Sequence, residues 1–187
     1  MKLPVQSTTF LAAILAAIAP VALQTVSSTL LPNPAIAHTR IAQTRTAPAP
    51  TPRLTQATAT TSLEQTAFQQ VNAYRASKKL PPLKWDERIA QQSRLHSQAM
   101  ANKQVPFSHQ GFEQRLQRIH QAGLSYSSAA ENVAYNMGYA DPVTQAVQGW
   151  IKSTGHRRNM EGNFTSTGLG VARNARGEVY FTQIFIR

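Results

Sequence analysis

Residues 150–160, with the sequence WIKSTGHRRNM, carry the strongest indication of how this chain folds. They follow an amphipathic segment that begins at Asp141, a residue type favoured at helix N-caps, with Pro142 at the first helical position. Apolar residues then recur at helical spacing, at Val143, Ala146, Val147, Trp150 and Ile151. We therefore expect a helix that buries Trp150, followed by a loop that carries His156.

Three further helices are expected upstream of this one. The first begins near Ser62, where Ser62 and Gln65 have the form of a capping box, and it ends before the LPPL sequence at 80–83. The second begins at Asp86, and the third covers about 112–122. His96 falls on the apolar stripe of the second helix, where a hydrogen-bonded core histidine is the favoured interpretation.

Strand-like apolar runs lie between and after these helices, at 132–135, 167–172 and 178–186. The last two flank residues 174–177, NARG, which predict a hairpin turn. Three or four helices with a few antiparallel strands predict an α+β layered domain.

The first 37 residues have the features of a signal peptide. Lys2 precedes the apolar run FLAAILAAIAPVAL at 10–23, and residues 35–37, AIA, form the small-x-small pattern that signal peptidase reads. The run is short for a transmembrane helix, which needs about 20 apolar residues. We expect cleavage after Ala37 and a mature chain without a membrane span; an uncleaved membrane anchor is the alternative.

Residues 38–61 are rich in Thr, Ala and Pro and nearly lack large apolar side chains. Such a segment cannot bury enough surface to order itself, so it is expected to be a disordered linker before a folded domain at 62–187. The chain has no cysteine. No disulfide can support that domain, which must therefore be held by an apolar core.

The net charge of +11, from 19 Lys and Arg against 8 Asp and Glu, favours anionic surroundings. Envelope polymers and lipid headgroups are such surroundings. Nucleic acid is disfavoured, because the chain has neither a dense Lys/Arg block nor a nucleic-acid-binding motif.

A series of short motifs between Phe68 and Phe185 resembles the CAP superfamily, in the SCP-like form found in secreted bacterial members. This superfamily contains cysteine-rich secretory proteins, antigen 5 and plant pathogenesis-related class 1 proteins. The motifs, in chain order, are FxxVNxxR at 68–75, LPPLxW at 80–85, HSxxM at 96–100, FSH at 107–109, ENVA at 131–134, WxxSxGHRxNM at 150–160, GxGVA at 168–172 and YFTQIF at 180–185. The resemblance implies an α-β-α sandwich with a central antiparallel sheet flanked by helices.

The resemblance also implies a binding cleft. Plant and animal members place two His and two Glu there, sometimes around a divalent metal. His109 matches the first His, and Glu131 matches the Glu of the ENxA motif. Ser153 stands where the second Glu is found and Tyr180 where the second His is found, while the bacterial pattern supplies His156. The implied cleft is His109, Glu131 and His156, with Ser153 and Tyr180 at its edge.

Two imidazoles and a carboxylate leave three chemical roles open for His109, Glu131 and His156. They can ligate a divalent metal such as zinc, perform general acid–base chemistry, or brace loops against the sheet by hydrogen bonds. No HxxxH or HExxH spacing decides between these roles. Burying Glu131 is costly without a partner, which predicts that it pairs with one of the histidines.

The expected protein is therefore secreted, periplasmic or attached to the cell envelope. The favoured function is that of a ligand-binding or interaction module, whose ligand is an anionic polymer, a peptide or a lipid. The alternative is a hydrolase that acts on peptide or cell-wall material through the same cleft.

Overall fold

The computed structural model describes residues 52–187, with side chains described from residue 60 onward. The expected signal peptide at 1–37 and residues 38–51 of the linker expected at 38–61 lie outside the described residues. Residues 52–187 form five helices and four strands, in the order α1 (Pro52–Ser77), β1 (Lys84–Trp85), α2 (Glu87–Ala101), α3 (Phe112–Gln121), β2 (Ala129–Asn136), α4 (Pro142–Lys152), α5 (Thr154–Glu161), β3 (Ser166–Arg173) and β4 (Val179–Ile186).

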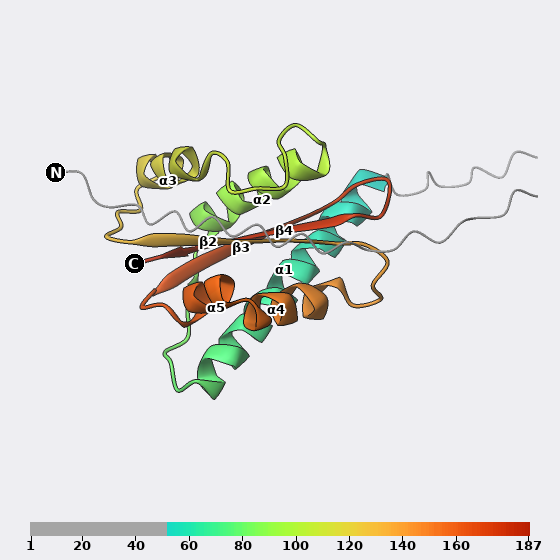
Figure 1. Ribbon diagram of the computed structural model, residues 1–187. Coiled ribbons are helices and arrows are strands. Elements are labelled where there is room, and N and C mark those ends of the chain that lie inside the picture. The colour runs from blue at the N-terminus through green and yellow to red at the C-terminus, as the bar shows by residue number, and fades with distance from the viewer. Residues whose placement is uncertain (1–51) are drawn as a thin grey trace, which may run out of the picture. The chain divides into compact units, whose positions relative to one another are not determined.

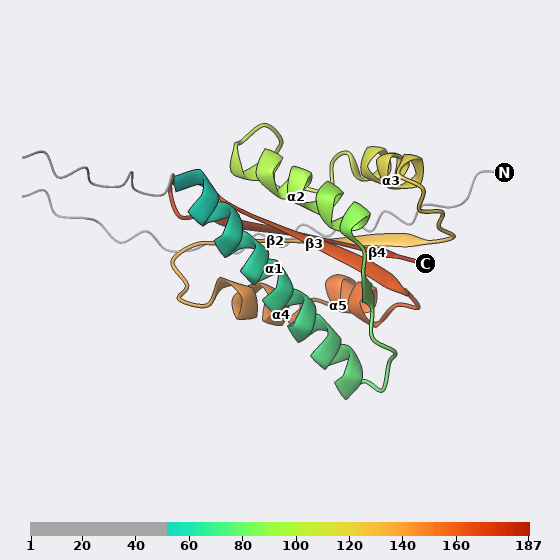
Figure 2. The ribbon, with the colours of Figure 1, turned by 180° about the vertical axis from the view of Figure 1, so that it is seen from behind.

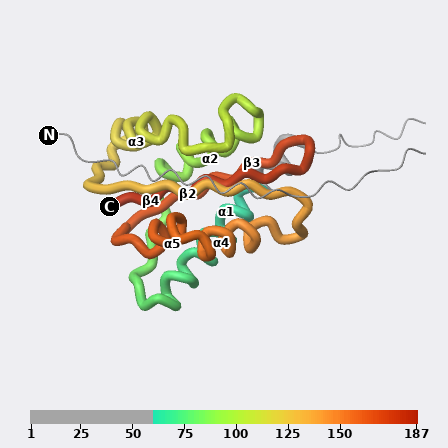
Figure 3. The backbone as a smooth tube through the Cα atoms, viewed as in Figure 1, coloured from blue at the N-terminus to red at the C-terminus, as the bar shows by residue number. Residues whose placement is uncertain are grey.

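The strands form one sheet in the order β1-β3-β4-β2, with helices on both faces. Helices α2 and α3 cover one face, and α1, α4 and α5 cover the other (Figures 1 and 2). Figure 3 shows the sheet running between these two helical layers. This is the expected α-β-α sandwich. Its sheet is mixed rather than purely antiparallel, because the two residues of β1 pair in parallel with β3.

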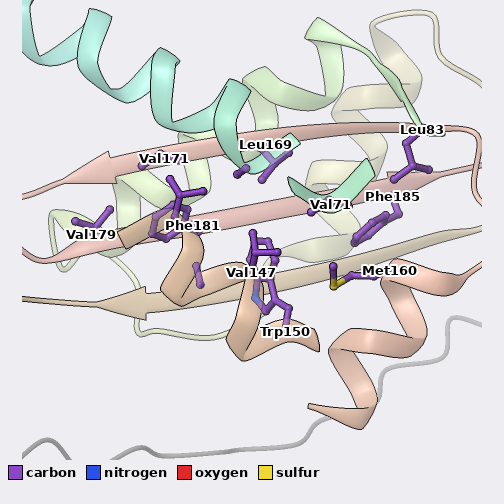
Figure 4. Close-up of a cluster of buried hydrophobic side chains, with 13 residues drawn as sticks. Val71, Leu83, Val147, Trp150, Met160, Leu169, Val171, Val179, Phe181 and Phe185 are labelled. Atoms are coloured by element: carbon purple, nitrogen blue, oxygen red, sulfur yellow. The ribbon is translucent and has the colours of Figure 1, made fainter. Parts of the chain in front are cut away.

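Alternation along β4 divides the core between the two faces. Phe181 and Phe185 lie in a cluster with Trp150 and Met160 on the α1, α4 and α5 side (Figure 4). Tyr180 and Ile184 belong to clusters on the α2 and α3 side, as the period-2 geometry of a strand requires. Trp150 is 1% exposed and donates its indole N–H to the Val133 carbonyl at 3.0 Å, which confirms it as a core residue.

Helix α2 lies directly on β3 because β3 carries glycine at the points of closest approach. A Cβ atom added to Gly168 would lie 2.1 Å from the Ala90 nitrogen, and one added to Gly170 would lie 2.1 Å from the Arg94 nitrogen. Serine hydroxyls of α2 donate to the carbonyls of both glycines, Ser93 at 3.0 Å and Ser97 at 2.9 Å. The helix and the strand are therefore joined by hydrogen bonds from serine side chains to backbone carbonyls, without an intervening apolar layer.

Two sequence-based expectations need correction. Helix α1 begins at Pro52, so residues 52–61 are helical and not part of a disordered linker. Adding turns to an existing helix costs little once its nucleus is formed, and the packed part of α1 supplies that nucleus. His156 lies in α5 and not in a loop, because a new helix begins directly after Ser153.

Candidate functional site

Glu131 lies in β2, an edge strand of the sheet, and its carboxylate is buried against a guanidinium. Arg115 of α3 donates from Nε to Oε2 at 2.9 Å and from Nη2 to Oε1 at 2.7 Å. The two side chains, Arg115 and Glu131, are 6% and 1% exposed, in that order. A bidentate arginine–carboxylate pair fixes the plane and the position of both groups.

His109 contacts the same carboxylate from the loop that follows α2. Its Nδ1 lies 2.9 Å from Oε1 of Glu131, while its side chain remains 40% exposed. A carboxylate only accepts, so Nδ1 carries the proton and Nε2 keeps a lone pair in the neutral ring. Arg115 also donates to the carbonyls of Gln110, at 2.9 Å, and of His109, at 3.4 Å, which holds the loop in place.

His156 reaches the same strand from the opposite helical layer. The amide Nδ2 of Asn132 donates to the His156 carbonyl at 3.1 Å. Asn159, one turn further along α5, donates to the Glu131 carbonyl at 3.2 Å and to Oδ1 of Asn132 at 2.9 Å. These hydrogen bonds attach α5 to β2 directly beside Glu131.

The charge state of His156 depends on this position. Burial lowers the pKa of His156, and the positive charge that His109 can carry lowers it further. His156 is neutral at neutral pH, because its pKa lies below the ordinary value for histidine.

The remaining expected site residues lie at different distances from this group. Ser153 caps α5, one turn before His156. Tyr180 pairs with Tyr135 in the sheet, whereas Glu131 pairs with Ile184. That difference in register is roughly 13 Å along the strand, so Tyr180 does not join the Glu131 cluster. The Tyr180 hydroxyl instead contacts Lys103.

His96 lies behind the site and has a structural role, as its place on the helical stripe predicts. It is 4% exposed, and its Nε2 lies 2.8 Å from the Ser108 carbonyl. The bond holds the residue before His109 against α2. Burial is the main reason that the pKa of His96 is lowered.

His109, Glu131 and His156 do not fit a metal centre in this arrangement. Within residues 60–187, no three His, Asp or Glu side chains gather closely enough to hold a metal ion. Both Glu131 oxygens accept from Arg115, and a divalent cation there would meet a buried guanidinium of the same sign. The arrangement can instead recognise a ligand through the imidazoles or position His109 for proton transfer.

The family model for the cysteine-rich secretory protein family, CAP, matches residues 68–185. This chain belongs to the CAP family. The match covers every motif from the first helix to the last strand, including the segments that carry His109, Glu131 and His156. The CAP fold is thereby established for this chain.

Similar proteins are found among bacterial CAP members. The uncharacterized membrane protein YlbC of Bacillus subtilis (strain 168) is 32% identical over 130 residues, which is 68% of this chain and 35% of that protein. An extracellular protein containing an SCP domain from Bacillus anthracis has a TM-score of 0.62 and 31% identity, over 75% of this chain and 45% of that one. This chain therefore spans less than half the length of both relatives.

The likeness to a third protein extends to the fold alone. An outer surface protein from Borrelia burgdorferi has a TM-score of 0.59 at 15% identity, over 68% of this chain and 94% of that one.

In the present CAP domain, the described residues 52–187 contain no helix with the length and apolar character needed to cross a membrane.

Arg115 is the site residue that the family motifs did not indicate. It lies on the buried side of α3, beside Leu116 and one turn before Ile119, a stripe of otherwise apolar residues. An arginine at such a position requires a buried partner, since its charge is costly to remove from water. The place of Arg115 on this apolar stripe could therefore have predicted an acidic partner, and the chain has few acidic residues.

Proposed function

We propose that this chain is an extracytoplasmic CAP module that binds an envelope ligand through His109 and His156, with Ser153 toward the edge of the cleft. The observation that supports the proposal best is the state of His109. Its ring is 40% exposed and is held at Nδ1 by Glu131, which leaves Nε2 for a ligand. A buried arginine orients that carboxylate, so the exposed imidazole is fixed in advance, and preorganisation of this kind favours binding.

Export is supported by the N-terminal sequence and by the relatives. The apolar run at 10–23 and the AIA sequence at 35–37 are typical of a cleaved signal peptide. The Bacillus anthracis relative is an extracellular protein. YlbC is a membrane protein, so attachment to the membrane is the alternative form of an extracytoplasmic location.

A hydrolase acting on peptide or cell-wall material is the second candidate, and one contact favours it. The Nδ1 of His109 is bound to a carboxylate, which is the arrangement that prepares Nε2 to act as a general base. The same contact therefore serves recognition or catalysis. Turnover distinguishes the two functions.

The test uses soluble peptidoglycan fragments with the chain carrying both His109→Ala and His156→Ala. Calorimetry should show that the unaltered chain binds these fragments and that the double variant loses about tenfold in affinity, since two hydrogen bonds of roughly 0.5–1.5 kcal/mol each are removed. His120→Ala is the matched control, because His120 is exposed on α3. Equal affinities for all three chains would contradict the proposal.

Mass spectrometry of the same mixtures separates the binding module from the enzyme. Intact fragments after prolonged incubation are the result expected of a binding module. Cleaved fragments that disappear in the double variant would assign the hydrolase function to the same site.

A further inference from the structure

The acidic residues of the domain are distributed unevenly over its surface. The chain has eight of them, and five form ion pairs. Of the other three, Glu113 belongs to α3, Asp141 caps the start of α4, and Glu161 is the last residue of α5. The C-terminal ends of α1 and α4, which share a helical layer with α5, therefore carry no acidic residue (Figure 2).

Cationic side chains gather at the ends of these helices and on α5. They form a basic surface that consists of Lys78 and Lys79, directly after α1, Lys152, the last residue of α4, and Arg157 and Arg158 of α5. Arg157 is half-buried, and the other four residues are exposed. None of the five forms an ion pair within residues 60–187. Their charges are therefore available to a ligand.

Contacts around Tyr74 bring the three helices together at this surface. The Lys78 ammonium lies 5.5 Å from the centre of the Tyr74 ring, and the Tyr74 hydroxyl donates to Glu161 at 2.6 Å. Arg157, one turn before Glu161, donates to the carbonyl of Ile151 near the end of α4 at 3.0 Å. These contacts link α1, α4 and α5, so the five cations belong to one continuous surface.

A buried arginine fixes this arrangement. Arg75 is 1% exposed, and its Nη1 donates to the carbonyls of Met160, at 2.7 Å, and Gly162, at 3.0 Å. Its Nε donates to the Pro81 carbonyl at 2.9 Å, in the loop that follows Lys79. The end of α1 is thus held against the end of α5, and preorganisation of this kind lowers the entropic cost of binding.

The positive charge of the basic surface is not cancelled by its neighbours. Within residues 60–187, Glu161 is the one carboxylate at these helix ends, against five cations. Asp141 lies at the opposite end of α4, about 16 Å from Lys152 along the helix. That separation exceeds the Debye length of about 8 Å in physiological salt. Glu64 of α1 is already paired with Arg94 of α2 at 2.7 Å. The basic surface therefore attracts an anion that carries several charges.

The surroundings of the basic surface favour a polymer over a bilayer or a nucleic acid. The large apolar side chains exposed between residues 60 and 187 are Leu95, Phe107, Tyr135, Met137 and Tyr139, and none of them belongs to α1, α4 or α5. Stable attachment to a bilayer combines charge with an apolar anchor, and binding of single-stranded nucleic acid relies on exposed aromatic rings. The basic surface offers charge alone, in the form of Lys and Arg side chains that bind phosphate groups.

We propose that the basic surface binds a flexible polymer that carries phosphate groups along its backbone, of the phosphodiester or polyphosphate type. Successive phosphates pair with the cations of α1, α4 and α5, and the counterions released from the polymer drive association. This contact uses the side chain of neither His109 nor His156, so it is independent of the function proposed above.

The test is calorimetric titration of the full chain with inorganic polyphosphate of defined length at several salt concentrations. The double variant Lys78→Gln with Arg158→Gln should weaken binding about tenfold or more. It should also reduce the slope of log affinity against log salt concentration by roughly one to two, since two phosphate contacts are lost. Lys84→Gln with Arg118→Gln is the matched control, because it removes the same charge from exposed positions on β1 and α3. The control should change the affinity by less than about twofold, as expected for screened charges outside the contact.

Two comparison probes identify the class of partner. Phosphatidylglycerol vesicles and duplex DNA should each bind more weakly than polyphosphate at equal phosphate and salt concentrations. The inference is overturned if polyphosphate does not bind, or if the control variant weakens its binding as much as Lys78→Gln with Arg158→Gln does. Tighter binding of the vesicles would assign this surface to a membrane, and tighter binding of DNA would assign it to nucleic acid. Either result would contradict the proposal.

Discussion

At the scale of single residues, the site depends on one buried ion pair. Arg115 and Glu131 come from α3 and β2, and each satisfies a charge that the other would leave unpaired. Removing one member of such a pair is far more costly than removing both, since an isolated buried charge remains. The ion pair therefore controls both the stability of the domain and the position of His109.

Replacing Arg115 should show this asymmetry directly. Arg115→Met should lower the free energy of unfolding by about 3–5 kcal/mol, because the Glu131 carboxylate keeps its burial but loses its main partner. The double variant Arg115→Met with Glu131→Gln should lose clearly less than the sum of the two single variants. Urea denaturation measures these values, and Arg118→Met, at an exposed position of the same helix, should stay within about 0.5 kcal/mol. Strict additivity would contradict the account.

Acid should destabilise the domain through its buried histidines. The pKa values of His96 and His156 are lowered in the folded chain, chiefly by burial. As the pH falls below about 6.5, the unfolded chain takes up protons before the folded one does, so the free energy of unfolding decreases. Each histidine contributes a slope of at most about 1.4 kcal/mol per pH unit.

The variant His96→Gln should flatten this dependence, since it removes one of the two groups and keeps a donor for the Ser108 carbonyl. Urea denaturation between pH 7 and pH 5 measures the slope. His120→Gln, at an exposed position of α3, should leave it unchanged. An identical slope in His96→Gln and the unaltered chain would show that His96 is not responsible.

Sequence reasoning reached part of this arrangement. The cost of burying Glu131 predicted a histidine partner, and the structure shows His109 in that position. Arg115 was missed because the family motifs contain the residues around the cleft, whereas Arg115 lies behind them and binds Glu131. Tyr180 was placed at the edge of the cleft by analogy, but the register of β2 with β4 puts it four positions further along the strand.

At the scale of elements, the contact between α2 and β3 depends on the absence of side chains. Gly168 and Gly170 face Ala90 and Arg94 so closely that an added methyl group would overlap the helix backbone. Backbone atoms cannot rotate away as a side chain can, so the two elements would have to separate. The loop that carries His109 leaves α2, and it would move with that helix.

Matched glycine variants test this contact. Gly170→Ala should lower the free energy of unfolding by about 3 kcal/mol or more, because the new Cβ lies 2.1 Å from the Arg94 nitrogen. Gly149 lies at an exposed position within α4, where an added Cβ atom would have no neighbour within 4 Å. Gly149→Ala should instead raise the free energy of unfolding by about 0.5–1 kcal/mol. Thermal unfolding of both variants gives the comparison. A mild effect at Gly170 would mean that α2 lies further from the sheet.

The elements themselves were predictable where periodicity and caps agree. Asp141 and Pro142 marked the start of α4, and the structure places both there, with Asp141 accepting from the Thr144 N–H. Helix α5 was taken for a loop, since its eight residues are too few and too polar for a periodic pattern. Tertiary bonds from Asn132 and Asn159 hold it, and no local signal reveals such bonds.

At the scale of the whole molecule, the most evident property is the positive charge of the chain. The net charge of +11 suits a surface that meets anionic polymers. The family and the fold were recognisable because many short motifs keep their order across residues 68–185. The ligand was not recognisable in the same way, because the fold positions the cleft whereas its side chains set the specificity.

Export has its own test. Expressed in a bacterium, the chain recovered outside the cytoplasm should begin at His38, as the AIA sequence at 35–37 predicts. N-terminal sequencing of the extracellular and membrane fractions gives the answer. A chain that remains full-length and cytoplasmic would refute export, and a full-length chain in the membrane would establish an anchor in place of a cleaved signal.

The central claim is that Glu131 fixes the exposed imidazole of His109 for a ligand that also meets His156. Nitrogen NMR of the chain labelled at histidine tests it most directly, because it reports the proton position and the environment of each ring. His109 should carry its proton on Nδ1, and soluble peptidoglycan fragments should shift the resonances of His109 and His156 but not those of His120. A proton on Nε2 of His109, or ligand shifts confined to His120, would contradict it.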